Sequence, residues 1–241
     1  MIDVKNVSKV FGTKKAVDDI SFTVEKGDVL GFIGPNGAGK STTMRMITGF
    51  LPPTSGEITI AGVSMSDFPL EAKRKIGYLP ENAPLYLNKT VREFLNFVAE
   101  IRGFSGKEKR VRVEETIERC FLEPVVKQKI ETLSKGYKHR ACFAQALLHD
   151  PSVLILDEPT DGLDPNQKRE VRRLIKEMGE TKAIIISTHI LEEVEAVTTR
   201  VLLINNGKKV FDDTPKAFKK LSKKGNLDDV FAKLTLGDDA A

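Results

Sequence analysis

The sequence has 241 residues, of which 40% are hydrophobic and 30% are charged, and its formal net charge is +4. At about 150 residues per domain this length allows one large domain or two small ones, and a chain of this size buries a sizeable core without disulfide bonds. The charge is too small to indicate nucleic-acid binding. The longest apolar runs are strand-sized, well short of the ~20 residues that a membrane helix needs. We therefore expect a globular chain that binds no nucleic acid and does not itself span a membrane.

The few cysteines and histidines exclude several kinds of site. Cys120 and Cys142 do not form a Cys-x-x-Cys pair, and their separation matches no metal-ligand pattern. His139, His149 and His189 are scattered and lack the His-Glu-x-x-His run of metalloproteases. We expect both cysteines to be buried as small hydrophobic residues.

The first expected elements are strands and one helix. Residues 2–10 alternate apolar and polar side chains with one irregularity, which indicates a half-buried strand. Residues 22–24 and 57–60 are short strand candidates, and the continuous apolar run 29–33 is typical of a buried strand. A glycine-rich loop follows this run and leads into a helix at 40–48. The order of strand, glycine-rich loop and helix is typical of a phosphate-binding unit.

From about residue 84 to 149 the pattern changes to helical spacing. A capping box from Thr90 to Glu93 opens one helix, and further helices are expected at 112–121 and 136–148. This block separates the strands before it from those after it. We therefore expect a helical subdomain inserted into a domain built around a sheet.

Strand patterns return after the helical block. Buried-type strands at 152–156 and 183–187 flank a helix at 166–178. Strands at 201–204 and 208–211 enclose an Asn-Asn-Gly turn, which is a hairpin signal. The alternation predicts an α/β fold, with a mostly parallel sheet core, an antiparallel β edge and the inserted helical subdomain.

Residues 34–41 carry a complete Walker A pattern, Gly-x-x-x-x-Gly-Lys-Ser, which marks the chain as a P-loop NTPase. Glycines let backbone amides turn inward around phosphate oxygens, and the helix N-terminus adds its positive dipole end. Lys40 places a charge on the β- and γ-phosphates, and the Ser41 hydroxyl is a ligand for Mg²⁺. We predict that nucleotide phosphates bind to Gly34, Pro35, Asn36, Gly37, Ala38, Gly39, Lys40, Ser41 and Thr42.

A carboxylate pair, Asp157 and Glu158, follows the buried run 153–156. The carboxyl ends of parallel strands lie where open α/β sheets bind ligands. Asp157 is expected to hold Mg²⁺ through water, and Glu158 is expected to poise an attacking water as general base. Capping of the next helix is the alternative role for the pair, and the Walker A pattern favours the catalytic hypothesis.

With these motifs the chain resembles the nucleotide-binding subunit of ABC transporters over nearly its whole length. The most specific motif is Leu133-Ser134-Lys135-Gly136-Tyr137, which resembles the ABC signature Leu-Ser-Gly-Gly-Gln and departs from it at Lys135 and Tyr137. Ser134 and Gly136 stand at an expected helix start, where a hydroxyl and backbone amides bind phosphate. The resemblance implies that Ser134, Lys135 and Gly136 meet the γ-phosphate of ATP held by a second copy of the chain.

Further residues match the family in order along the chain. Phe11 matches the aromatic that stacks on adenine, with Val17 beside it, and a core position is the alternative for Phe11. Asp164 ends an Asp-Gly-Leu-Asp segment that resembles the loop crossing the dimer interface, although the segment also fits a plain turn. His189 resembles the switch histidine that contacts the γ-phosphate and orients the water. The resemblance implies a catalytic set of Glu158, His189 and Lys40.

One loop position departs from the family pattern. Glu81, in Tyr78-Leu79-Pro80-Glu81, stands where the family usually has glutamine. A carboxylate oxygen ligates Mg²⁺ or its water, so we expect a metal site formed by Ser41, Glu81 and Asp157. A loop residue that faces solvent is the alternative for Glu81.

The resemblance also implies a function and its partners. It implies an ATPase that needs ATP and Mg²⁺, pairs as a homodimer on binding ATP, and powers transport by a separate membrane-spanning subunit. Such a chain lies at the cytoplasmic face of the cell membrane and contacts the membrane through that partner. Residues 227–231 resemble a tail motif of exporter ATPases, and the signature most resembles their gliding-motility branch. The alternatives are an ordinary amphipathic helix for 227–231 and, for the chain, a soluble ABC ATPase serving an assembly such as iron–sulfur cluster biogenesis.

The resemblance also gives expected domain boundaries. An ABC ATPase domain is expected at 1–225, in which segments 1–83 and 150–213 form the RecA-like core and residues from about 84 to 149 form the helical subdomain. Residues 226–241 are expected to be a short C-terminal tail.

Overall fold

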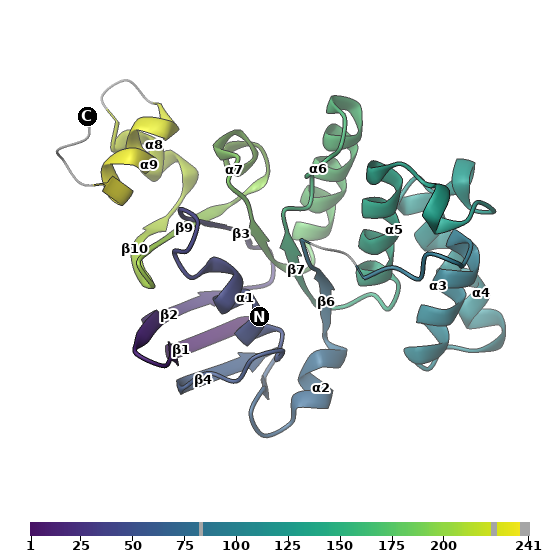
Figure 1. Cartoon of the computed structure of the whole chain (residues 1–241), viewed down its shortest axis with the longest axis horizontal. Helices are drawn as coiled ribbons and strands as arrows, with labels where there is room; N and C mark the ends of the chain where they lie inside the picture. The colour runs from purple at the N-terminus through teal and green to yellow at the C-terminus, as the bar shows by residue number, and fades with distance from the viewer. Residues whose placement is uncertain (82–83, 223–225, 237–241) are drawn as a thin grey trace.

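A six-stranded, mostly parallel sheet lies at the centre of the molecule (Figure 1). The structure is a computed structural model that describes residues 1–81, 84–222 and 226–236. Five neighbouring strands of this sheet run parallel, and β10 pairs antiparallel with β9 at one edge. Across the sheet the strands are β10 (Lys208–Asp213), β9 (Arg200–Asn205), β3 (Val29–Ile33), β8 (Ala183–Ser187), β7 (Val153–Asp157) and β6 (Ile76–Leu79). The strands β3, β7 and β8 are buried along their whole length, as their continuous apolar sequences predict.

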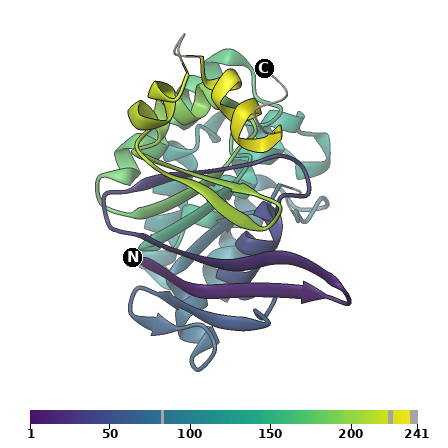
Figure 2. The same ribbon diagram turned by 90° about the vertical axis from the view of Figure 1, so that its left-hand side faces the viewer.

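A second sheet is entirely antiparallel and is larger than the edge that the sequence predicts. Its strands are, in spatial order, β2 (Lys14–Val24), β1 (Ile2–Phe11), β4 (Ser55–Ile60) and β5 (Val63–Ser64). The register of β1 against β2 shifts three times, which accounts for the irregular alternation along β1. In Figure 2 this hairpin lies beside the β9–β10 hairpin, because β2 contacts β10. The antiparallel part therefore comprises both the predicted edge and a separate sheet.

The helix α1 (Lys40–Ile47) is held between these two sheets. Its buried side chains Met44, Met46 and Ile47 belong to one apolar cluster with residues of the antiparallel sheet and with Leu30 and Phe32 of β3. The glycine-rich loop that joins β3 to α1 is thus anchored at both ends in the same core. Burial of this kind is the main source of stability in a folded chain.

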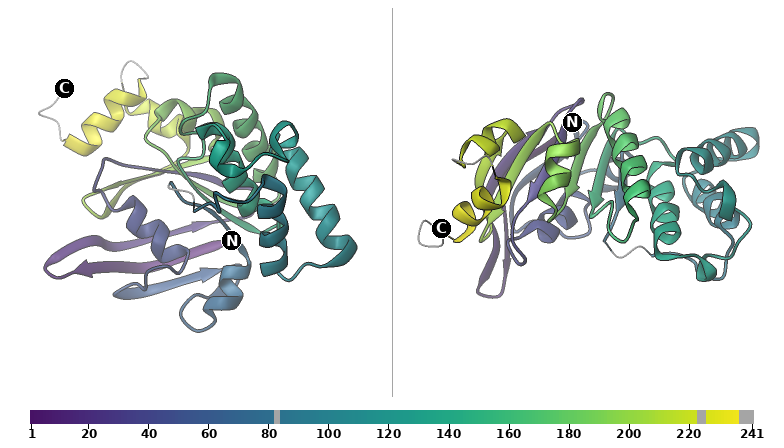
Figure 3. Two further views of the ribbon diagram at one scale, coloured as in Figure 1. Left: turned by 45° about the vertical axis from the view of Figure 1, so that its right-hand side comes forward. Right: turned by 90° about the horizontal axis from the view of Figure 1, so that it is seen from above.

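The helical block stands at one end of the molecule, beyond β6 (Figure 3, right). It holds α3 (Val91–Ile101), α4 (Gly106–Arg119), α5 (Lys135–Leu147) and the short 3₁₀ turns η1 (Glu123–Val125) and η2 (Ile130–Thr132). Both hydrogen bonds of the capping box that the sequence predicts at Thr90 are present. The helix expected at 112–121 begins earlier, at Gly106. The sequence did not reveal its first turns because they are exposed and carry no apolar periodicity.

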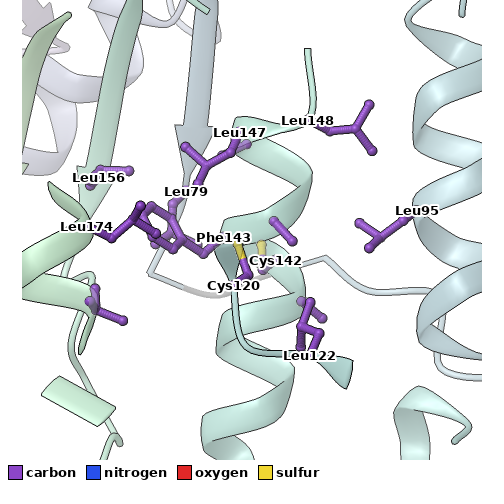
Figure 4. Packing of buried hydrophobic residues seen from close by; sticks show 14 of the residues in the cluster. Leu79, Leu95, Cys120, Leu122, Cys142, Phe143, Leu147, Leu148, Leu156 and Leu174 are labelled. Atoms are coloured by element: carbon purple, nitrogen blue, oxygen red, sulfur yellow. The ribbon is translucent and has the colours of Figure 1, made fainter. Parts of the chain in front are cut away.

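The helix α5 packs against the parallel sheet on one side and against the other helices of the helical block on the opposite side. Figure 4 shows Phe143 and Leu147 of α5 on the side of Leu156 and Leu174, which come from β7 and α6 (Pro165–Gly179), and Leu95 on the opposite side of α5. All of these side chains belong to one continuous apolar cluster. The helical block therefore shares its core with the parallel sheet.

The chain ends in short helices beyond β8. They are α7 (Leu191–Val197), α8 (Pro215–Lys220) and α9 (Leu227–Leu236). From α9, Leu227 and Val230 pack with Phe218 of α8 and with Ile33, the last residue of β3. The sequence did not predict α7, nor the short helix α2 (Pro69–Arg74). The expected boundaries at 83 and 225 fall outside the described residues.

Within the part of the chain that the structure describes, no helix combines the length and the apolar character needed to cross a bilayer.

Candidate nucleotide-binding site

The loop between β3 and α1 forms a cradle of backbone amides. Gly37 and Gly39 have φ angles of 79° and 109°, in the left-handed region that favours glycine. A Cβ on Gly39 would lie 2.6 Å from the carbonyl oxygen of Ala16, so no side chain fits there. The Lys40 amine folds back over the loop and donates to the carbonyl oxygens of Gly34 at 2.5 Å and Pro35 at 3.0 Å. The cradle, residues 34–41, is therefore shaped before any ligand binds.

Three carboxylates lie within electrostatic reach of Lys40. Burial lowers the pKa of the Lys40 amine, and the charges of Glu158, Asp157 and Glu81 oppose that effect. The amine thus lies among acidic groups in a partly desolvated position. Because the Lys40 amine is partly removed from water, its electrostatic attraction for a phosphate is stronger than that of an exposed amine.

A small cavity opens beside the cradle on the side of the antiparallel sheet. It has a volume of about 310 Å³ and is lined by Phe11, Lys14, Ala16, Asn36, Gly37, Gly39, Lys40, Ser41 and Thr42. The ring of Phe11 is half exposed, and the Lys9 amine lies 5.4 Å from its centroid. Val17 is fully buried, so Ala16 takes the lining position that the sequence suggested for Val17. Lys14 also lines this cavity and was not predicted.

The predicted carboxylate pair lies at the carboxyl end of β7. Asp157 is buried, and the Ser187 hydroxyl at the end of β8 donates to its Oδ1. Glu158 adopts a left-handed backbone with φ of 50°, held by a hydrogen bond from its N–H to the Ser187 carbonyl at 3.0 Å. A non-glycine residue in this conformation is strained, and such strain is concentrated at active sites and ligand-binding segments.

The side chain of Glu158 is paired with His189. Nδ1 of His189 lies 2.8 Å from Oε1 of Glu158. Burial raises the pKa of the Glu158 carboxyl, and the contact with His189 opposes that rise. Only 15% of the Glu158 side chain is exposed, whereas 65% of the His189 side chain is. A carboxylate of raised basicity beside an exposed imidazole is suited to accept a proton from water.

The three residues predicted to hold a metal come together. Ser41, Glu81 and Asp157 all line one cavity of about 670 Å³ between the cradle and the helical block. They offer a hydroxyl and two carboxylates, the oxygen donors that Mg²⁺ prefers, and Mg²⁺ usually takes one or two carboxylates and completes its shell with phosphate and water. Accordingly, the described residues contain no group of three His, Cys, Asp or Glu side chains that by itself would hold a metal ion. The donor set fits Mg²⁺ bound together with a nucleotide.

The signature turn, residues 134–136, lies apart from both cavities. Ser134 caps α5 and accepts from the Tyr137 N–H at 3.4 Å, and the Lys135 amine is 2.8 Å from Oδ2 of Asp161. Gly136 is packed so closely that an added Cβ would lie 2.6 Å from Oε1 of Gln167. No residue of this turn lines the 310 Å³ or the 670 Å³ cavity. Neither of these two cavities therefore joins the signature turn to the cradle of the same chain.

Asp164 has a local structural role in this chain. It is the N-cap of α6, and its Oδ1 accepts from the backbone N–H groups of Asn166 and Gln167, both at 3.0 Å. A capping aspartate satisfies amides that the helix itself leaves unpaired. The carboxylate expected to contribute to nucleotide binding is therefore already occupied within its own chain.

Sequence reasoning also missed Glu193, which lies near the Glu158–His189 pair. Its carboxylate is buried and accepts hydrogen bonds from the Thr160 and Thr188 hydroxyls, and it lies 3.5 Å from the Arg172 guanidinium. Thr188 precedes His189, and Thr160 follows Glu158 by two positions, so Glu193 joins the two segments that carry this pair. The apolar spacing of Leu191, Val194 and Val197 was the available signal, because it places position 193 near a buried helix face.

Comparison with known proteins points to one family. The model of the ABC transporter family matches residues 17–161. A linearmycin resistance ATP-binding protein, LnrL of Bacillus subtilis, is 39% identical over 211 residues, which cover 87% of this chain and 68% of LnrL. The bacitracin transport ATP-binding protein BcrA of Bacillus licheniformis is 41% identical over 210 residues, covering 86% of this chain and 68% of BcrA.

Two solved structures agree with these matches. An ATP-binding subunit of an ABC transporter superposes with a TM-score of 0.88 at 30% identity, covering 97% of this chain and 99% of that one. A dimeric post-hydrolysis state of the ATP-binding cassette MJ0796, bound to ADP and Pi, gives a TM-score of 0.82 at 26% identity, covering 89% of this chain and 98% of the other.

Proposed function

The chain belongs to the ABC transporter family, as an ATP-binding and ATP-hydrolysing subunit that works with a membrane-spanning partner, and we propose the roles of its residues. Gly34–Thr42 hold the phosphates, Phe11 stacks on the adenine, and Lys40 neutralises charge on the β- and γ-phosphates. Ser41, Asp157 and Glu81 would hold Mg²⁺, which would supply further charge neutralisation on the phosphates. Two copies of the chain pair when ATP binds.

Hydrolysis in this proposal uses the Glu158–His189 pair. Glu158 accepts a proton from the attacking water, for which its buried and therefore more basic carboxylate is suited. His189 is bonded to Glu158 through Nδ1, so its opposite ring edge is available to contact the γ-phosphate. The buried carboxylate of Glu193 positions His189 by holding the preceding Thr188. The chemistry therefore resides on the two neighbouring strand ends of β7 and β8.

One observation carries the pairing of two copies. The signature turn carries an exposed serine and a lysine at a helix N-terminus, the chemistry that binds phosphate, yet it lines neither cavity of its own chain. A head-to-tail pair brings the signature turn of one copy to the nucleotide of the other. ATP then stabilises the closed pair because it contacts both copies, and loss of the γ-phosphate opens it.

The 670 Å³ cavity is also suited to pass this motion to the membrane-spanning subunit. Beyond its metal-binding end it is lined by Arg45, Lys73 and Arg102, and by the aromatic rings of Phe50 and Tyr78, whose centroids are 5.8 Å apart. Within the described part of the chain none of these three cations has an ion-pair partner. A short segment of the partner with one apolar side chain and one carboxylate complements this surface.

The direction of transport is proposed to be export. LnrL and BcrA are named for antibiotic resistance and transport, and a further relative is a Nod factor export ATP-binding protein from Burkholderia lata, 38% identical over 217 residues. The tail motif at 227–231 supports the same class and forms part of α9, which packs on its own chain. We place the chain at the cytoplasmic face of the membrane, with an ATPase domain at 1–225 that contains a helical subdomain at 84–149, and a tail at 226–241. None of the comparisons favours a role in iron–sulfur cluster assembly.

A single substitution tests the proposal. Glu158→Gln should lower ATP hydrolysis by about 10²- to 10⁴-fold, the usual contribution of a general base, and should accumulate an ATP-bound dimer in size-exclusion chromatography. The matched control is Glu158→Gln with Ser134→Arg, which keeps the cradle and blocks the turn, and should stay monomeric in ATP. A Glu158→Gln protein that remains monomeric at saturating ATP would contradict the proposal, as would a dimer of the double variant.

A further inference from the structure

The signature turn is tied to the loop after Glu158 by one side chain, Lys135. Its amine pairs with Oδ2 of Asp161 at 2.8 Å, and its aliphatic stem covers Gly162, where an added Cβ would lie 2.6 Å from Cδ of Lys135. Lys135 and Asp161 are 26 positions apart in the sequence. The pair therefore links the N-terminus of α5 to the loop that leads from β7 into α6.

A lysine at this position is unfavourable unless an anion lies near it. The first turn of α5 contains no acidic residue, and Lys135 and Lys138 both lie at the positive end of the helix dipole. Asp161 is the anion that compensates Lys135, and accordingly the hydrogen bond from Lys135, together with its charge, lowers the pKa of Asp161. The signature turn thus carries excess positive charge, and in this chain the Asp161 carboxylate is bound to it.

The pair is also easily exchanged. Its side chains are 70% and 52% exposed, and exposed ion pairs contribute little stability because water and salt screen them. A terminal phosphate carries more negative charge than one carboxylate and offers several acceptor oxygens, so its hydrogen bonds to an amine are stronger. Ser134 adds a hydroxyl whose bond to the Tyr137 N–H, at 3.4 Å, is long.

We infer that Lys135 is a phosphate-sensing residue that exchanges partners: Asp161 holds it in the nucleotide-free chain, and the γ-phosphate of the ATP bound to the second copy takes it when the two copies close. The inference rests on the proposed head-to-tail pairing. It assigns Asp161 the role of an internal competitor of the γ-phosphate.

The exchange has a consequence inside the same chain. The Asp161 N–H donates to the Glu158 carbonyl at 3.1 Å, so Asp161 closes the turn that positions Glu158. When Lys135 leaves Asp161, this turn loses its tether to α5. The signature turn binds the ATP of the second copy, whereas Glu158 acts on the ATP of its own chain. Binding at the signature turn therefore changes the turn that positions Glu158.

The test uses two substitutions that act in opposite directions. In the Glu158→Gln background, the ATP concentration for half-maximal dimerisation is measured by light scattering. Asp161→Asn frees Lys135 without removing it, so it should lower this concentration by about threefold, the value of an exposed ion pair. Lys135→Met removes the cation and should raise it by about tenfold or more, as expected for a charge-assisted hydrogen bond. The double substitution should behave like Lys135→Met.

The matched control is Lys109→Met, which removes another exposed lysine whose amine lies 2.8 Å from Glu100 and should leave the ATP requirement unchanged. If Asp161→Asn and Lys135→Met both weaken dimerisation, or neither changes it, the pair is only structural and the inference is wrong. In that case normal dimerisation of the Glu158→Gln parent leaves the proposed function intact. If that parent does not dimerise in ATP, the proposed function and the inference both fail.

Discussion

The cradle and the signature turn bind the same kind of ligand but are built in different ways. The cradle is fixed by its backbone, with left-handed glycines, a buried strand before it and a core helix after it. The signature turn consists of an exposed serine with a long hydrogen bond and a lysine in a surface ion pair. The half that holds ATP is therefore complete before the ligand arrives, whereas the other half depends on side chains that change partners.

The largest effect on stability is expected beside the cradle, at Glu193. Glu193→Ala removes the acceptor for two hydroxyls and leaves Arg172 without its buried partner, so it should lower the free energy of unfolding by about 3–5 kcal/mol. Urea denaturation measures the loss. The neighbouring Glu192, whose side chain is 82% exposed, is the control, and Glu192→Ala should change stability by less than about 0.5 kcal/mol. Equal losses of stability in the two variants would mean that the buried contacts of Glu193 do not hold the segments that carry Glu158 and His189.

A smaller effect is expected inside the cradle itself. Gly39→Ala imposes both a left-handed backbone and a contact with the Ala16 carbonyl, so it should cost about 2–3 kcal/mol and weaken ATP binding. Gly37→Ala has the same backbone strain with nothing within 4 Å of the added Cβ, and should cost about 1 kcal/mol. Calorimetry with ATP and thermal unfolding measure both. The idea of a backbone-fixed cradle fails if Gly39→Ala binds ATP as tightly as the parent.

The pH dependence of hydrolysis tests the chemistry next to the cradle. Because burial raises the pKa of Glu158 above its ordinary value of 4.5, the base is protonated, and activity lost, as the pH falls through that raised value. Below it, kcat/KM should fall about tenfold per pH unit. His189→Ala removes the contact that lowers this pKa, so the acidic limb should move to higher pH. An acidic limb at or below pH 4.5, or one that moves to lower pH in His189→Ala, would show that Glu158 is not the titrating base.

The smallest effect is expected at the start of α6. Asp164→Ala removes the N-cap and should cost about 1 kcal/mol, measured by thermal unfolding. Asp164→Asn keeps a capping oxygen and should retain stability and ATP-dependent dimerisation. If Asp164→Asn is stable but no longer dimerises, the carboxylate acts at the interface between copies and not only as a cap.

Elements that are buried on both faces could be predicted closely from the sequence. The runs that became β3, β7 and β8 are continuous and apolar, and each was placed within one residue of its observed bounds. In contrast, β2 extends eight residues before the predicted start at 22, because charged residues on its outer face hide the alternation. The four-residue β6 and the uncapped α7 carry too little local signal to be found.

The site likewise contains residues that local sequence motifs predict and residues that only the tertiary structure shows. The positions of the cradle, Asp157 and Glu158 follow from local motifs, because strand, loop and helix lie next to one another in the chain. The contacts of Glu193 and of Lys135 join residues 33 and 26 positions apart, so only the tertiary structure shows them. The burial of Val17 has the same origin, since the side of a half-buried strand that faces the core is decided by its partners.

The most direct test of the central claim mixes two inactive variants. Lys40→Ala disables the cradle of its copy and Ser134→Arg blocks the signature turn of its copy, so neither homodimer holds an intact site. In a head-to-tail heterodimer, the cradle of the Ser134→Arg copy meets the signature turn of the Lys40→Ala copy, and one complete site forms. ATP hydrolysis should therefore return when the two are mixed. Hydrolysis that stays absent in the mixture, while tagged copies still associate in ATP, would contradict the claim that two chains share each ATP.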